Sequence, residues 1–161
     1  MQNDRLRVID ADSHVDETED TWEYVDDPSL KPLIGRYENH PDGRGRYWLI
    51  DGNKVPRANR DDSITGTTVE TRELLDVEAR LRHMDELGVD IHVIYPTTLL
   101  RCTATRPEVE LNVTRSYNRW IADRTAQGGG RLRWVFVPSP LNIDESVVQK
   151  ITTRKMPLVP A

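Results

Sequence analysis

Three short apolar runs along the chain predict the strands of a parallel sheet. The first run covers residues 6–11, the second residues 90–95 and the third residues 132–137. The second and third runs are nearly continuous stretches of β-branched, aromatic and aliphatic side chains, and each is followed by a proline. Strands that are covered on both faces of a parallel sheet show this pattern. The runs therefore predict an α/β fold.

The segment before the second strand and the segment between the second and third strands have apolar residues at helical spacing, which predicts helices there. Asp76 is placed to cap a helix that Gly88 ends, and a second helix begins at Pro107. The second helix carries an apolar stripe, which we interpret as core and which consists of Val109, Val113, Tyr117, Trp120 and Ile121. The glycines at 128–130 stop this helix, and Asn142 predicts the start of a short third one.

The stretch from about residue 16 to about residue 75 does not follow the alternation of strand and helix. Its prolines and polar composition indicate an insertion after the first strand, and residues 47–55, with an Asp-Gly turn in the middle, predict a small hairpin. Insertions at this place often form substrate walls, so Trp22 and Trp48 are candidates for substrate binding. The alternative is that these aromatic side chains anchor the insertion to the core.

Composition and charge indicate which classes of binding partner to expect. The chain has 161 residues, of which 37% are hydrophobic and 30% charged, with a net charge of −5, which fits one domain spanning residues 1–161. Because no basic stripe is present, we exclude nucleic acid and membrane surfaces and expect a small-molecule substrate. No signal peptide or transmembrane stretch is recognisable, which predicts a cytoplasmic location. The single cysteine, Cys102, excludes an internal disulfide.

The candidate chemistry lies where the first strand ends, at Asp10, Asp12 and His14. Side chains alternate between the two faces of a strand, so we expect these three to point the same way at intervals of about 6.6 Å. A carboxylate and an imidazole on a strand end predict a divalent metal site, with Asp12 and His14 as ligands. Zinc is the first expectation, and manganese or iron is the alternative. The competing interpretation is that the acidic residues only solvate a loop.

Five segments occur in order along the chain: IDADSHV at 9–15, RLRHMDELGVD at 80–90, IYPT at 94–97, YNRWI at 117–121 and RLR at 131–133. Together they resemble the amidohydrolase-related family (amidohydrolase 2), which includes enzymes of the aminocarboxymuconate-semialdehyde decarboxylase type. The resemblance covers residues 6 to about 148, although the insertion matches only in general character.

The resemblance implies a (β/α)₈ TIM barrel with a divalent metal at its carboxyl-terminal mouth, and hydrolysis of amide or ester-like bonds or decarboxylation of unsaturated and aromatic acids. The usual first-strand pattern of the family is His-x-His or Glu-x-His, and Asp12-Ser13-His14 stands in its place. A full barrel needs about 250 residues. We therefore expect a partial TIM barrel made of the first three β/α units, with a long insertion after strand 1.

Two functions stay open at this point. The first is a metal-dependent hydrolase or decarboxylase that acts on a small carboxylic acid, ester or amide; its catalytic residues are not identified, and Asp16, Glu17 and His40 are the candidates for an acid or base. The second is a catalytically inactive truncated fragment that acts by association with another chain. The third strand would then form an open edge, through which we expect a homo-oligomer.

Overall fold

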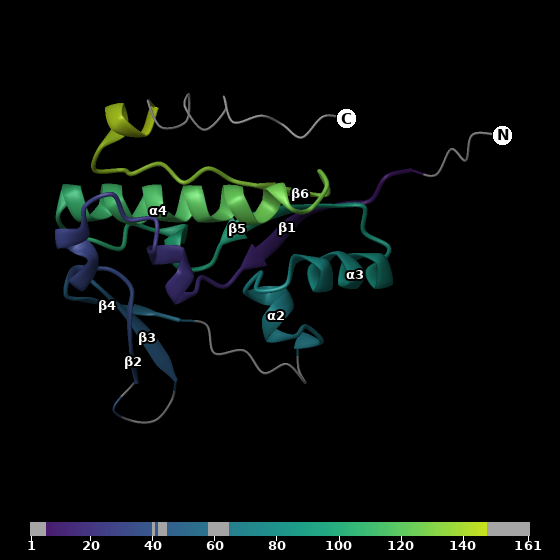
Figure 1. Cartoon of the computed structure of the whole chain (residues 1–161), viewed down its shortest axis with the longest axis horizontal. Helices are drawn as coiled ribbons and strands as arrows, with labels where there is room; N and C mark the ends of the chain where they lie inside the picture. Colours follow the sequence, from purple (N-terminus) through teal and green to yellow (C-terminus); the bar gives the residue numbers. More distant parts are fainter. Residues whose placement is uncertain (1–5, 40, 42–44, 58–64, 148–161) are drawn as a thin grey trace.

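A three-stranded parallel sheet forms the centre of the fold (Figure 1). The computed structural model describes residues 6–39, 41, 45–57 and 65–147. The sheet consists of β1 (Ile9–Val15), β5 (Ile91–Pro96) and β6 (Leu132–Trp134), in the order β1-β5-β6. The prediction of a mixed α/β fold with these three strands side by side and parallel is confirmed.

The limits of the strands differ from those predicted. β1 extends to Val15 instead of residue 11, because β5 continues to pair with it as far as Pro96. Asp12 and His14 therefore lie inside the strand rather than just beyond it. β6 ends at Trp134 instead of residue 137.

The first two predicted helices are present, as α3 (Val77–Leu87) and α4 (Pro107–Ala126), and the predicted third helix starts after Asn142, with residues 143–147 helical. Asp76 caps α3 by accepting the backbone N–H of Ala79 on its Oδ1 at 3.0 Å, and Gly88 ends this helix with a left-handed backbone, φ 69°. The shorter helical segments are α2 (Val69–Arg72), the 3-10 helices η1 (Glu19–Trp22), η2 (Pro28–Leu33) and η3 (Thr98–Leu100), and residues 143–147. Within the described ranges, no helix has the length and apolar character needed to cross a bilayer.

The apolar stripe of α4 lies in the core, as predicted. Its members are each at most 1% exposed: Val109, Val113, Tyr117, Trp120 and Ile121. They form one cluster with side chains from β1, α3 and β5, among them Val15, Met84 and Ile94, which are completely buried. Burial of an aliphatic or aromatic side chain of this size stabilises a fold by roughly 1.5–3 kcal/mol. The cluster therefore holds α4 and α3 against the parallel sheet.

The insertion contains a second, antiparallel sheet in the order β2-β3-β4. Its strands are β2 (Arg36–Asn39), β3 (Arg46–Ile50) and β4 (Asn53–Pro56). The predicted hairpin is confirmed as β3 and β4, joined at Asp51 and Gly52, whose φ values of 52° and 78° suit a two-residue hairpin turn. β2 was not predicted, because its four residues are mostly polar and become a strand only by pairing with β3.

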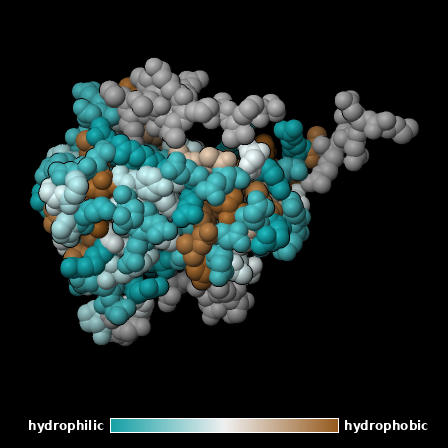
Figure 2. Space-filling view, viewed as in Figure 1, coloured by the Kyte–Doolittle hydropathy of each residue, from teal (hydrophilic) through white to brown (hydrophobic). Residues whose placement is uncertain are grey.

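Aromatic rings fix this second sheet to the rest of the molecule. Trp22 of η1 and Trp48 of β3 meet edge to face, with ring centroids 5.5 Å apart, and Tyr37 stacks on Trp48 at 3.5 Å. Gly35 lies directly against the Trp22 ring. The space-filling view shows a mostly hydrophilic face, with apolar residues gathered near α2 and β1 (Figure 2).

The contact between Gly35 and Trp22 generates a stability prediction. A Cβ at Gly35 would lie 1.9 Å from Trp22 Cδ1, whereas a Cβ at Gly52 has nothing within 4 Å; both glycines have a positive φ, of 73° and 78°. We expect Gly52→Ala to cost about 1 kcal/mol through backbone strain alone. Gly35→Ala should cost about 2 kcal/mol more, because the tryptophan has to move. Urea unfolding measures both, and equal losses would show that the Trp22 contact is unimportant.

Candidate functional site

Asp12 and His14 lie together near the carboxyl end of β1. His14 Nε2 is 3.8 Å from Asp12 Oδ1, and their side chains are 27% and 98% exposed. His14 Nδ1 lies 3.0 Å from the carbonyl oxygen of Pro96. Because a carbonyl oxygen can only accept, this contact places the imidazole proton on Nδ1 and leaves the lone pair of Nε2 available on the side of Asp12.

This pair fits part of a divalent-metal site. Two donor atoms that each lie about 2.1 Å from one tetrahedral zinc ion are roughly 3.4 Å apart, and the 3.8 Å between Asp12 Oδ1 and His14 Nε2 is slightly longer. A backbone carbonyl on Nδ1 is also the kind of support that orients metal-binding histidines. In the described residues, no group of three or more His, Cys, Asp or Glu side chains is close enough to hold a metal ion. The described part of the chain thus supplies two donors.

Asp10 does not join the pair, and the prediction that it faces the same way is wrong. The pairing of β1 with β5 slips between Asp10, opposite His92, and Ser13, opposite Ile94. Three steps along β1 therefore match two steps along β5, which is a bulge that re-aims the side chains. The Asp10 carboxylate accepts the N–H of Asp12 at 2.9 Å and lies 3.6 Å from His92 Nε2.

His92 is buried, with 4% of its surface exposed. Its Nδ1 accepts a hydrogen bond from Arg80 Nε at 3.2 Å, while its Nε2 faces Asp10. Burial, and next the neighbouring Arg80 guanidinium, lower the pKa of His92 from 6.5 to about 4. The ring is therefore neutral at neutral pH and links Asp10 to Arg80.

The other carboxylates of this region are held inside the fold. Glu17 is 1% exposed and accepts the backbone N–H groups of Thr97 at 3.0 Å and Thr98 at 2.9 Å. Burial raises the pKa of Glu17 above its usual value. Asp16 is 5% exposed and lies 3.5 Å from Arg72 Nε. Glu17 therefore ties the end of β1 to the segment after β5; His40, the third candidate for an acid or base, lies outside the described residues.

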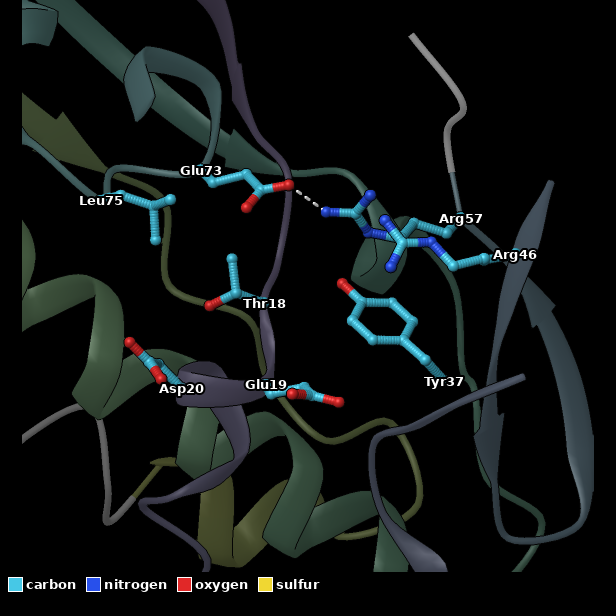
Figure 3. A pocket seen from close by; sticks show the side chains of 8 residues that line it. All are labelled: Thr18, Glu19, Asp20, Tyr37, Arg46, Arg57, Glu73 and Leu75. Carbon is cyan, nitrogen blue, oxygen red and sulfur yellow. Dashed lines mark hydrogen bonds and ion pairs between the residues drawn. The ribbon is translucent and has the colours of Figure 1, made fainter. Parts of the chain in front are cut away.

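A pocket of about 220 Å³ lies within the insertion, between the start of η1, the β2-β3-β4 sheet and the segment that follows α2 (Figure 3). It is lined by Thr18, Glu19, Asp20, Tyr37, Arg46, Arg57, Glu73 and Leu75. Arg57 forms an ion pair with Glu73, and both side chains are largely buried. The guanidinium carbons of Arg46 and Arg57 lie 4.9 and 5.1 Å from the centre of the Tyr37 ring, within the range of cation–π contacts.

The Tyr37 ring contacts both arginines of this pocket. Its hydroxyl donates to the carbonyl oxygen of Glu17 at 3.2 Å, and burial raises its pKa above the usual range, so the phenol is neutral. Arg57 is balanced by Glu73, whereas Arg46 has no carboxylate partner among the described residues. The lining thus combines the guanidinium groups of Arg46 and Arg57 with the carboxylates of Glu19, Asp20 and Glu73. Sequence reasoning missed this pocket; the signal was the pair of arginines at the two ends of the predicted hairpin.

Trp22 and Trp48 lie in the core rather than on the pocket wall. They are 4% and 0% exposed, and neither belongs to the residues that line the pocket. Their position agrees with the anchoring alternative. Substrate binding by these two rings stays a prediction that no described contact supports.

The fold was compared with known proteins. Neither a protein-family profile nor a curated protein sequence matches the chain. Among solved structures, an amidohydrolase from Mycobacterium avium subsp. paratuberculosis K-10 matches 92% of this chain with a TM-score of 0.59 and 17% sequence identity. The chain shares the fold of an amidohydrolase. It spans 48% of that protein, so the similarity concerns about half of the amidohydrolase.

The buried His92 makes stability depend on pH. Its pKa is about 4 in the folded chain and 6.5 in the unfolded chain, so between these values only the unfolded chain binds the proton. Stability should be fully present above about pH 6.5 and fall by up to about 3 kcal/mol as the pH drops to about 4. Urea unfolding across this range measures the loss. His92→Gln should make the free energy of unfolding less dependent on pH, and the control His83→Gln should keep the wild-type dependence. If the free energy of unfolding changes equally with pH in the wild type and in His92→Gln, the assignment to His92 is contradicted.

Proposed function

We propose that this chain is a metal-dependent hydrolase or decarboxylase of the amidohydrolase-related type, acting on a small carboxylic acid, ester or amide. The observation that carries the proposal is the Asp12–His14 pair near the carboxyl end of a parallel strand, in a fold shared with an amidohydrolase. Active sites of barrels and open parallel sheets lie at the carboxyl ends of the strands. In this proposal β1, β5 and β6 are the first three strands of a TIM barrel.

Asp12 and His14 are the residues that would hold the metal, through Oδ1 and Nε2. When bound, a divalent ion would supply Lewis-acid chemistry, by polarising a substrate oxygen and lowering the pKa of a water. Zinc suits an imidazole with a carboxylate, and a carboxylate in the first position also accepts manganese or iron. The Pro96 carbonyl keeps the His14 proton on Nδ1 and therefore keeps Nε2 ready to bind.

In the arginine pocket, named for Arg46 and Arg57, these two side chains are the groups that would bind a substrate carboxylate; the lining also holds Glu19, Asp20 and Glu73 and does not include Asp12 or His14. Arg57 is held in place by Glu73 and by the Tyr37 ring, so its guanidinium is already oriented before a ligand arrives. Arg46 lies over the same ring. Guanidinium groups bind carboxylates through two parallel hydrogen bonds, which fixes the direction of the bound molecule.

A second candidate function is association with another chain. In the described part of the chain, β1 and β6 are the outer strands of the parallel sheet, and each pairs only with β5. Ile9 on β1 is 56% exposed. Open strand edges with apolar side chains favour pairing with further strands. Light scattering over a dilution series tests this candidate: a concentration-dependent oligomer supports it, and a monomer at every concentration contradicts it.

Removing either candidate ligand tests the metal function. We expect Asp12→Ala and His14→Ala each to lower the affinity for Zn²⁺ and Mn²⁺ at least about tenfold, because each variant removes one of only two protein donors in the described residues. The wild-type affinity itself should be weak, since ordinary zinc sites have three or four protein ligands. Titration calorimetry measures these affinities.

The matched controls are Asp144→Ala, at an exposed position, and His83→Ala, whose side chain is 21% exposed, close to the 27% of His14; both should leave metal binding unchanged. Metal binding that survives in both ligand variants would contradict the assignment of Asp12 and His14. Assays with ester, lactone and aromatic-acid substrates then test turnover. Turnover that needs metal and is lost in His14→Ala would favour catalysis over the association function.

A further inference from the structure

We propose that Arg80 is a positioning residue for the two candidate metal ligands, and that it acts through the backbone of β1. The inference rests on the proposed metal function of Asp12 and His14. Arg80 belongs to α3 and is 4% exposed, so it is available neither to solvent nor to a substrate. Its influence on the site has to pass through the groups that it contacts.

The guanidinium of Arg80 bonds with all three of its nitrogens. Nη1 and Nη2 both donate to the carbonyl oxygen of His14, at 3.2 and 3.1 Å, and Nη2 also donates to Ser13 Oγ at 2.6 Å. Nη1 donates to the carbonyl oxygen of Thr71 at 3.0 Å, and Nε donates to His92 Nδ1 at 3.2 Å. One buried side chain therefore joins β1 to α2 and to β5.

These contacts fall on the part of β1 that decides where the ligand pair points. The bulge lies between Asp10 and Ser13, and Arg80 binds the residue at its end and the carbonyl of the next one. Holding the His14 carbonyl fixes the orientation of the peptide that follows the imidazole-bearing carbon. The imidazole then lies within 3.0 Å of the Pro96 carbonyl and 3.8 Å of Asp12.

The shape of the guanidinium matters as well as its charge. A buried cation is costly unless its donors are satisfied, and among the described residues Arg80 donates to backbone carbonyls, a hydroxyl and a neutral imidazole. A lysine keeps the charge but has one nitrogen on a flexible stem and does not reproduce a planar fork. Arg80→Lys therefore separates positioning from simple charge.

The experiment compares Arg80→Lys with Arg82→Lys in the whole chain. Arg82 lies on the same helix, and its 65% exposed side chain is 3.5 Å from Asp76, which makes it a matched control. The first readout is the tautomer of the His14 ring from nitrogen NMR without metal, with His14→Ala to identify the signal. The second readout is the absorption spectrum and affinity of bound Co²⁺.

We expect Arg80→Lys to lose the single Nδ1–H tautomer of His14 and to bind Co²⁺ about 10–100-fold more weakly, the usual effect of losing support around a ligand. Arg82→Lys should match the wild type in both readouts. If Arg80→Lys folds, shown by an unchanged circular dichroism spectrum, and keeps both the tautomer and the Co²⁺ affinity, the proposal is overturned.

The two proposals fail in different ways. If the wild type binds no Co²⁺, the metal function fails, and the His14 tautomer still decides whether Arg80 positions the ring. If Arg80→Lys does not fold, Ser13→Ala removes the 2.6 Å contact alone. We expect Ser13→Ala to shift the tautomer in the same direction and by less; an unchanged tautomer in that variant overturns the positioning role.

Discussion

The bulge in β1 is the constraint on which the candidate site depends. Asp10 and Ser13, which flank the bulge, contact the buried side chains of His92 and Arg80. The Asp12 and His14 side chains instead come within 3.8 Å of each other. A regular strand would keep the two aspartates on one face with the histidine. The extra residue separates them, so one carboxylate supports the strand and the other remains exposed beside the imidazole.

Buried polar side chains that contact β1 and its neighbours would destabilise the fold without hydrogen-bond partners, and the fold supplies these partners from within the chain. Arg80 supplies donors to the backbone of β1 and α2, and Glu17 takes two backbone N–H groups of the segment after β5. The carboxyl end of β1 is therefore held from two directions. Support of this kind keeps a pair of ligands at a defined separation, which a metal site requires.

The insertion contributes a polar pocket, lined by Arg46 and Arg57 together with the carboxylates of Glu19, Asp20 and Glu73. Its antiparallel sheet is fixed by the stacked rings of Trp48 and Tyr37, and this arrangement gives Arg46 and Arg57 a rigid ring to lie on. The tryptophans thus affect the pocket indirectly, by holding Tyr37. The likeness to an amidohydrolase concerns the fold alone and about half of that protein, so the proposed chemistry depends on the side chains of this chain.

The sequence by itself determined the elements whose signals are local: the capped helix α3, the proline start of α4 and the β3–β4 hairpin. Each depends on residues a few positions apart. The sequence placed Asp12 and His14 just after the first strand, whereas pairing with β5 extends β1 over both residues. Only the tertiary structure decided the bulge, the strand β2, the burial of Trp22 and Trp48, and the arginine pocket. Arg80 and Ser13 are 67 positions apart along the chain, and no local pattern records such a contact. The direction of Asp10 followed from that long-range packing and not from the period of the strand.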